Sequence, residues 1–220
     1  MSKLIVLKLS GHLIKYENII KQTLSELRSL FRVARFVLIP GGSVFADFIR
    51  ELQVKMYFND DTAHWLAIKA MEMYGVYVTS LDELNILIEI YDFSEVQKAF
   101  NEYKIPILMP YKILKKHNEL PHNWSVTSDS IAIYIAGLLN ADLIVLAKPT
   151  SRVLGEKPDL TRKLTIADLK QVSTNIIDSF AIELLSKIKI PLVIYNMFKP
   201  FTLKHIVSRE PGDYVLIEPS

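Results

Sequence analysis

The sequence contains no cysteine, only seven glycines among its 220 residues, and no long uninterrupted hydrophobic run. Without cysteine the chain can form no disulfide, no thiolate nucleophile and no cysteine-ligated zinc site. The longest apolar stretch, residues 131–147, is broken by Asn140 and Asp142, which favours a helix followed by a strand over a membrane span. We therefore expect neither a disulfide scaffold nor a membrane-spanning segment.

An excess of charge of one sign is also missing. The formal net charge is +2, from 26 Lys and Arg against 24 Asp and Glu. This balance gives no electrostatic case for a nucleic-acid or membrane-surface partner and suits a small-molecule ligand. Met1-Ser2-Lys3 leads directly into the apolar Leu4–Leu7 with no small-residue cleavage site, so we expect a cytoplasmic protein without a signal peptide.

Apolar residues are spread evenly and no linker divides the chain, so residues 1–220 are expected to form a single domain around one core. Expected strands alternate with expected helices, which predicts an α/β fold with a mostly parallel sheet, helices on both faces, and ligands at the carboxyl ends of the strands. The expected strands are Leu4–Leu9, Phe36–Ile39, Val76–Thr79, Ile105–Met109, Leu143–Ala147, Leu192–Tyr195 and an edge hairpin ending in Tyr214–Ile217. The expected helices are Tyr16–Arg32, Val44–Val54, Asp60–Tyr74, Leu81–Ile90, Ser94–Tyr103, Ser128–Leu139, Ile177–Lys187 and Phe201–Val207, with a surface loop at Gly155–Lys163.

Four short sequences occur where an expected strand stops and a helix or turn begins. Small residues at such a point leave backbone N–H groups beside the positive end of a helix dipole, an arrangement that holds phosphate. Neither a P-loop nor a Rossmann fingerprint is present. Together the four sequences predict a phosphate-handling surface at one edge of the sheet. They are Lys8-Leu9-Ser10-Gly11, Pro40-Gly41-Gly42-Ser43, Thr127-Ser128-Asp129-Ser130 and Asn196-Met197-Phe198-Lys199-Pro200.

Lys8 and the Gly-Gly turn each allow two interpretations. Lys8 ends a strand just before a Ser-Gly turn, so its ammonium could stabilise a transferring phosphoryl group, whose transition state needs positioned positive charge. It could equally be a surface lysine beside a structural turn. Gly41 and Gly42 could let phosphate oxygens approach the backbone while Ser43 adds a hydroxyl, or they could form an ordinary strand-to-helix turn.

Asp129 opens an expected helix, where an aspartate is most often a simple cap. If it lies at the same sheet edge as Lys8, its carboxylate could orient the lysine and assist placement of magnesium or the acceptor. Asp178 opens another helix, and there the cap is the preferred interpretation. His64 and Trp124 could line an acceptor pocket. The histidine spacings fit no zinc template, so we assign no metal-ligating residues.

Taken in this order, the segments resemble the amino-acid kinase superfamily over nearly the whole chain. Lys8–Gly11 is similar to the first-strand lysine motif of that superfamily, Pro40–Ser43 to its glycine-rich acceptor loop, and Thr127–Asp129 to its helix-start aspartate. Pro191–Leu203 is similar to the C-terminal segment of uridylate kinases. Ala63-His64-Trp65 and Trp124–Ser130 look more like the archaeal branch that phosphorylates a furanylmethyl phosphate.

The resemblance implies a three-layer αβα sandwich, with an acceptor half at about residues 1–125 and a nucleotide half at about residues 126–220. It also implies ATP and Mg²⁺ as cofactors, a small-molecule acceptor, and a homo-oligomer. The implied catalytic residues are Lys8 and Asp129. From the motifs and the resemblance together we expect phosphate and acceptor binding at Ser10, Gly11, Gly41, Gly42, Ser43, Asp61, His64, Trp124 and Ser128. We expect nucleotide binding at Lys148, Thr150 and Arg152, where Lys148 and Arg152 could pair directly with phosphates and replace contacts of the family pattern that this chain lacks.

Departures from the uridylate kinase pattern bear on the ligands. Asp61–His64 replaces an Asp-x-x-Gly, and His122–Val126 replaces a glycine- and threonine-rich approach to the helix aspartate. These two changes favour a phosphate monoester with an aromatic or heterocyclic body over UMP, which stays as the alternative acceptor. Thr150–Val153 replaces an Asp-Gly of the nucleotide half. That change leaves open a protein of another class, a nucleotide-binding storage or regulatory protein on the same fold.

Overall fold

A computed structural model describes residues 2–117, 119–150, 162–171 and 176–219. In this part of the chain an eight-stranded sheet has the order β3-β4-β2-β1-β5-β7-β8-β6. Every neighbouring pair is parallel except β7 and β8. The strands are β1 (Lys3–Leu9), β2 (Ala34–Pro40), β3 (Leu87–Ile90), β4 (Ile105–Leu108), β5 (Leu143–Lys148), β6 (Arg162–Thr165), β7 (Leu192–Asn196) and β8 (Tyr214–Glu218).

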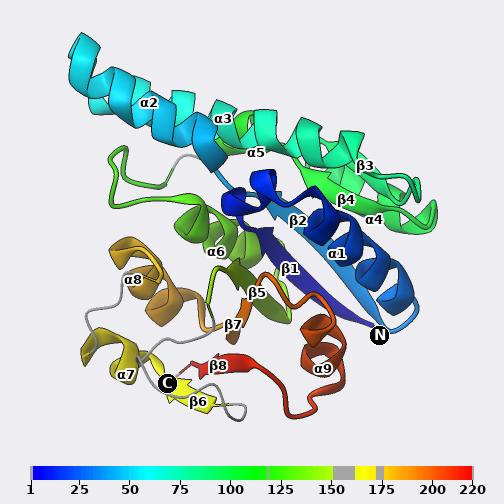
Figure 1. Ribbon diagram of the computed structural model, residues 1–220. Coiled ribbons are helices and arrows are strands. Elements are labelled where there is room, and N and C mark those ends of the chain that lie inside the picture. The colour runs from blue at the N-terminus through cyan, green and yellow to red at the C-terminus, as the bar shows by residue number, and fades with distance from the viewer. Residues whose placement is uncertain (1, 118, 151–161, 172–175, 220) are drawn as a thin grey trace.

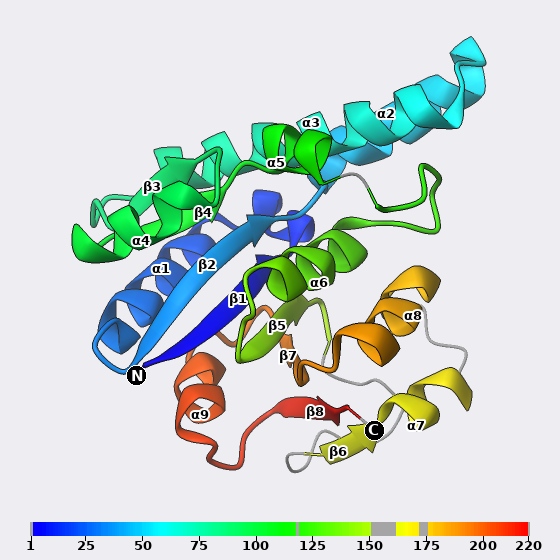
Figure 2. The same ribbon diagram turned by 180° about the vertical axis from the view of Figure 1, so that it is seen from behind.

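Helices cover both faces of this sheet, as Figures 1 and 2 show from opposite sides. The alternation of side chains along β1 divides the core, because Val6 packs with α6 and α8 while Ile5 and Leu7 pack with α1 and α9. This arrangement confirms the three-layer αβα sandwich with a mostly parallel sheet. One face carries α1 (Glu17–Leu30) and α9 (Thr202–Ser208); the other carries α4 (Ser94–Asn101), α5 (Pro110–Lys116), α6 (Ser128–Leu138), α7 (Ile166–Gln171) and α8 (Ser179–Ile188).

Helix α2 (Ser43–Met56) and the first part of α3 (Asp60–Ser80) extend beyond the sheet. A short 3-10 helix, η1 (Gly11–Lys15), follows β1, and α2 follows β2 and is joined to α3 by a tight turn. We call residues 43–66 the helical arm, which projects past the carboxyl ends of the strands in Figures 1 and 2. None of the residues of α2 is buried. Among the described residues, no helix has both the length and the apolar character that a bilayer crossing would need.

The predicted strand Val76–Thr79 is wrong, because these residues continue α3 to Ser80. The β-branched run favours a strand locally, but Tyr74 and Val78, one helical turn apart, are both fully buried in the core. Gly75 does not end the helix as predicted. A Cβ at this position would lie 2.9 Å from Sδ of Met109, so the glycine lets α3 pack closely against the end of β4.

Further predictions fail at the two edges of the sheet. The expected helix Leu81–Ile90 is instead a turn followed by β3, the edge strand beside β4. At the other edge, the predicted loop Gly155–Lys163 falls mostly outside the described residues, but its last two residues begin β6. The segment Tyr214–Ile217 belongs to β8, which pairs with β7 and β6 and is therefore not an edge strand. The short helices α5 and α7 were not predicted.

Candidate active site

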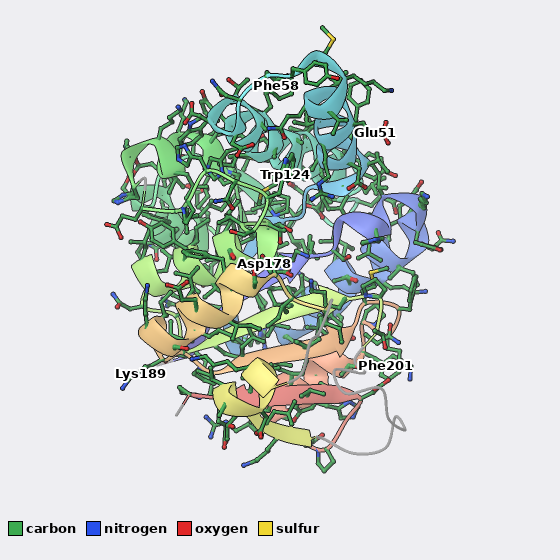
Figure 3. The ribbon with its side chains drawn as sticks, turned by 90° about the vertical axis from the view of Figure 1, so that its left-hand side faces the viewer. Glu51, Phe58, Trp124, Asp178, Lys189 and Phe201 are labelled. Carbon is green, nitrogen blue, oxygen red and sulfur yellow. The ribbon has the colours of Figure 1, made fainter. Side chains whose placement is uncertain are left out.

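A cavity of about 630 Å³ lies at the carboxyl ends of the central strands. Its walls come from the end of β1, η1, the helical arm, the loop before α6, the end of β5 and the residues that follow β7. Figure 3 views the molecule from the side on which the helical arm, the loop carrying Trp124 and the start of α8 at Asp178 follow one another. Both halves of the chain therefore contribute to one site.

Three charged side chains meet at the base of this cavity. Nζ of Lys8 lies 3.1 Å from Oδ1 of Asp129, and Nζ of Lys148 donates a hydrogen bond to Oδ2 of the same carboxylate. The side chains of Lys8, Asp129 and Lys148 are only 6%, 4% and 13% exposed. They come together because β1 and β5 are parallel neighbours that end at the same edge, while Asp129 lies in the first turn of α6. We call them the Lys-Asp-Lys triad.

The electrostatics of the triad favour an additional anion. Burial by itself would raise the pKa of Asp129, but the ammonium groups of Lys8 and Lys148 outweigh burial and hold that pKa below its usual range. Burial and the charge of Lys8 lower the pKa of Lys148, although Asp129 opposes them. With both lysines protonated, the triad has two cations for one carboxylate, and all three side chains are largely buried. A phosphoryl group placed beside it would offset that charge.

The turn after β1 and the turn after β2, which both contribute residues to the cavity wall, are in backbone contact. A Cβ on Gly11 would lie 2.2 Å from N of Ser43, and a Cβ on Gly41 would lie 2.6 Å from N of Gly11. Only glycine permits this approach of the turn after β1 to the turn after β2. Ser43 has a left-handed backbone with φ of 56°, and its buried hydroxyl has no hydrogen-bond partner among the described residues. A strained residue with a free hydroxyl at a cavity wall is typical of a binding site.

Gly11→Ala is expected to lower the free energy of unfolding by about 3 kcal/mol or more, because the new methyl group would overlap backbone atoms that cannot move aside. Chemical denaturation would measure the loss. The matched control is Gly212→Ala, whose Cβ would meet side-chain atoms of His205 and Tyr214 at 3.1 and 3.3 Å. Equal losses in the two variants would contradict the contact between the turns.

Trp124 is fixed in the cavity wall by the helical arm. Its Nε1 donates a hydrogen bond of 2.5 Å to Oε1 of Gln53, and the guanidinium of Arg50 lies 4.4 Å from the centroid of its ring. Nε2 of Gln53 in turn donates to Oδ1 of Asp60 at 2.7 Å. Arg50, Asp60 and Trp124 all line the cavity. The wall is therefore aromatic and charged, which suits a flat, polar ligand.

His64 lines the cavity next to this wall and packs in a stack of rings. The centroids of His64 and His122 are 4.2 Å apart with an interplanar angle of 14°, and Nδ1 of His122 lies 2.5 Å from Oδ1 of Asp61. Burial and the proximity of His122 lower the pKa of His64 to about 4, against the opposing effect of Asp61. The hydrogen bond with His122 lowers the pKa of Asp61. His64 is therefore a neutral ring at physiological pH.

The lowered pKa of His64 makes folding stability depend on pH. The unfolded chain takes up a proton on His64 near its ordinary value of 6.5, whereas the folded protein does so only near pH 4. Stability should fall as the pH drops through this window, by up to about 3 kcal/mol. Urea denaturation at a series of pH values should show this loss of stability in the native protein and a smaller loss in His64→Gln. The control is His117→Gln, which replaces an exposed histidine. If the free energy of unfolding changed with pH in the same way in the native protein and in His64→Gln, the lowered pKa of His64 would be contradicted.

The structure brings most of the predicted site residues to the cavity, but not all. Asp61 supports His122 and, among the described residues, is not one of those that line the cavity. Ser10 is buried, and its carbonyl accepts a hydrogen bond of 3.0 Å from the hydroxyl of Tyr74. Gly41 packs behind Gly11, Thr150 lies outside the lining residues, and Arg152 falls outside the described residues. The predicted residues that line the cavity are Lys8, Gly11, Gly42, Ser43, His64, Trp124, Ser128, Asp129 and Lys148.

Sequence reasoning missed other residues of the site. Arg50 and Gln53 lie three residues apart on a helix with no buried face, so no local pattern distinguishes them from solvated residues. Tyr16 and Phe198 also line the cavity, with ring centroids 4.9 Å apart in an edge-to-face contact. Of these four residues, only Phe198 could have been found from the sequence, because it lies within the strand-end sequence Asn196–Pro200.

Comparisons with known proteins concern the family and the fold of the chain. The model of the amino acid kinase family matches residues 3–196. The [5-(aminomethyl)furan-3-yl]methyl phosphate kinase of Methanocaldococcus jannaschii is 27% identical over 185 residues, which is 83% of each protein. The crystal structure of UMP kinase from Ureaplasma parvum superposes with a TM-score of 0.73 at 16% identity and covers 99% of both chains. Uridylate kinase from Archaeoglobus fulgidus gives 0.73 at 17% identity, with 98% of this chain and 99% of that chain covered.

Proposed function

The chain belongs to the amino acid kinase family, and from this premise we infer that its cavity is the site of phosphoryl transfer. The protein is an ATP-dependent kinase of a small molecule. We propose that the acceptor is a phosphate monoester and that the product is a diphosphate. The observation that carries this proposal is the buried Lys-Asp-Lys triad, which has an excess of positive charge at the base of a cavity shared by both halves of the chain.

In the proposed reaction an oxygen of the acceptor phosphate attacks the γ-phosphorus of ATP, and the bond from that phosphorus to the β–γ bridging oxygen breaks. ADP leaves with the bonding electrons. Lys8 and Lys148 stabilise the negative charge on the transferring group, and Asp129 holds both ammonium groups in place. The protein needs to position charge and needs no covalent intermediate.

The protonation states of the cavity residues favour a phosphate acceptor over an alcohol. An alcohol must lose a proton to a general base as it attacks. Both oxygens of Asp129 are engaged by lysines, and the pKa of His64 near 4 makes its ring a weak base. A phosphate monoester is already an anion at neutral pH and needs no base. The site thus suits a nucleophile that arrives deprotonated.

We propose that the body of the acceptor is an aromatic or heterocyclic ring that packs on the Trp124 wall and beside His64. Support comes from the aromatic lining of that part of the cavity and from the relative that acts on a furan phosphate. Backbone groups at Gly11, Gly42 and Ser43 would bind the acceptor phosphate, together with the free Ser43 hydroxyl. UMP is the alternative phosphate monoester.

ATP would bind in the nucleotide half, residues 126–220, facing an acceptor half formed by residues 1–125. Lys148 is the nucleotide-side group whose position supports this, and Thr150 and Arg152 stay predictions. The described residues contain no group of three or more His, Asp or Glu that could hold a metal ion. We propose that Mg²⁺ enters with ATP, where phosphate oxygens and water would bind it and it would neutralise phosphate charge. A cytoplasmic location stays a prediction from the sequence.

We propose that the homo-oligomer expected from the sequence forms through the helical arm. Phe48 is 57% exposed and Tyr57 is 91% exposed, and Val44, Val54 and Met56 are exposed beside them. An amphipathic helix that exposes its apolar residues is typical of an association surface. Sedimentation at micromolar concentration should give a species larger than one chain. A single monomeric species would contradict the proposal.

The direct test is ADP release by the purified protein with ATP and a panel of acceptors. The panel contains a furanylmethyl phosphate, benzyl phosphate, UMP, the parent alcohol furanylmethanol, and no acceptor. We expect ADP release with the heterocyclic phosphate, and ³¹P NMR should show a new diphosphate. If UMP were the only acceptor in the panel that supported ADP release, UMP would replace the heterocyclic phosphate as the assigned acceptor. Tight ATP binding with no acceptor-dependent ADP release would indicate the storage or regulatory protein instead.

Trp124→Leu is expected to raise KM for the heterocyclic phosphate by about ten-fold, because base–aromatic stacking contributes about 1–3 kcal/mol. KM for ATP should change less than about two-fold, since Trp124 precedes the nucleotide half. Steady-state kinetics with each substrate varied would separate the two constants. The matched control is Tyr103→Leu, an aromatic residue 73% exposed and away from the cavity. Equal changes in both KM values would contradict the placement of the acceptor.

A further inference from the structure

Asp178 makes more hydrogen bonds than a helix cap requires. Its Oδ1 accepts a bond of 2.7 Å from N of Ala181, which is the ordinary N-cap interaction for α8. Four further bonds reach the first turn of α6. Oδ2 accepts from N of Thr127 at 3.2 Å, from Oγ1 of Thr127 at 2.6 Å and from N of Ser130 at 3.1 Å, and Oδ1 accepts from Oγ of Ser130. The carboxylate therefore joins the starts of two helices.

The clamped segment contains the carboxylate of the triad. Thr127 and Ser130 flank Asp129, so Asp178 fixes the backbone on both sides of it. Oγ1 of Thr127 donates to Asp178 and also accepts a bond of 3.3 Å from N of Asp129. This hydroxyl connects the two aspartates through one side chain. Asp178 is not among the residues that line the cavity, so it acts on the reaction indirectly. Its hydrogen bonds reach Asp129 through the first turn of α6, and its charge opposes the effects that lower the pKa of Lys148.

We propose that Asp178 is a positioning residue for phosphoryl transfer, which rests on the proposed function of the triad. Its carboxylate holds the first turn of α6 at the rotation that places Asp129 between Lys8 and Lys148. Asp129 forms an ion pair with Lys8 through Oδ1 and accepts a hydrogen bond from Lys148 through Oδ2, so a rotation of its carboxylate would disturb both contacts. A displacement of about 1 Å at a reacting group can cost about 10²-fold in rate. In Figure 3 Asp178 lies at the start of α8 on the side viewed there, below the loop that carries Trp124.

Asp178→Ser separates this role from helix capping. Serine is a good N-cap for α8, but its side chain is too short to bridge the two helices. We expect kcat to fall by about 30-fold while the KM values for ATP and acceptor change less than about three-fold, the pattern of lost positioning rather than lost binding. Thr127→Val, which leaves Asp178 free to cap α8 and removes the connecting hydroxyl, should lower kcat in the same direction.

The control for a merely structural role is Leu184→Ala. Leu184 is buried in the core on α8, so its truncation should destabilise the fold while the bonds of Asp178 stay in place. We expect kcat of this variant to stay within about two-fold of the native value when it is assayed below its unfolding transition. Native kcat in either Asp178→Ser or Thr127→Val, or an equal loss in Leu184→Ala, would overturn the inference while leaving the proposed function intact.

A second readout does not depend on activity. Amide hydrogen exchange of residues 127–131 should be about ten-fold faster in Asp178→Ser than in Leu184→Ala, because only the first loses the clamp on α6. Failure of the native protein to phosphorylate any acceptor would overturn the proposed function. The clamp would then be judged by exchange alone, and equal exchange in the two variants would overturn it.

Discussion

Lys8→Ala is expected to lower kcat by about 10²–10³-fold, with little change in KM for ATP. The ammonium of Lys8 lies at the base of the cavity, paired to Asp129 and shielded from water, so its charge acts on the transferring group in a medium of low dielectric constant. Removing one preorganised group of this kind has a cost of that size in other enzymes. The protein should still fold, because Asp129 keeps its bond with Lys148.

Single-turnover and steady-state measurements of ADP release would test this expectation. The matched control is Lys3→Ala, which removes a lysine from the opposite end of the same strand. Lys3 is partly exposed and does not line the cavity, so kcat should stay near the native value. A fall of less than about three-fold in Lys8→Ala would show that Lys8 does not stabilise the transition state.

Asp129→Asn is expected to reduce both activity and stability. The substitution leaves two buried ammonium groups beside a neutral amide, and removing one partner from a buried ion pair has a cost of about 3–5 kcal/mol. Asp129 also opposes the effects that lower the pKa of Lys148, so that pKa should fall further in the variant. We expect kcat to drop by about 10²-fold or more because neither lysine is held in place.

The loss of stability should depend on Lys8. In the double variant Lys8→Met with Asp129→Asn, one of the two unpaired cations is absent, so the free energy of unfolding should recover in part while activity stays low. A double-mutant cycle from urea denaturation measures this coupling. Additive losses in the two single variants would contradict the account, since residues in one buried ion pair must be coupled.

The sequence predicted the family and the architecture of the fold, and both are confirmed. The strand at β1 was predictable because a parallel strand covered on both faces is apolar almost throughout. The run from Val76 to Thr79 was not, since its β-branched residues favour a strand and only the packing of Tyr74 and Val78 in the core keeps it helical. β3 lies within the predicted helix Leu81–Ile90, and the first half of β6 lies within the predicted loop Gly155–Lys163. Both are edge strands of four residues, each defined among the described residues by a single neighbouring strand.

The location of the candidate site at the carboxyl edge of the sheet was predictable from the sequence, but the contacts within the site were not. Lys8 and Asp129 follow from the rule that parallel strands present their carboxyl ends on one side of the sheet. The position of Lys148 depends on the pairing of β1 with β5, which sets Lys8 opposite Leu146 and cannot be read from spacing. The bond between Gln53 and Trp124 joins residues 71 positions apart, and the local sequence of neither segment indicates it.

The most direct measurement is a crystal structure with a non-hydrolysable ATP analogue and the heterocyclic phosphate bound together. We expect oxygens of the γ-phosphoryl group to lie within hydrogen-bonding distance, about 3 Å, of Nζ of both Lys8 and Lys148, with the acceptor phosphate against the turn at Gly42 and Ser43. A triphosphate bound away from the Lys-Asp-Lys triad, with the triad facing no phosphate, would contradict it.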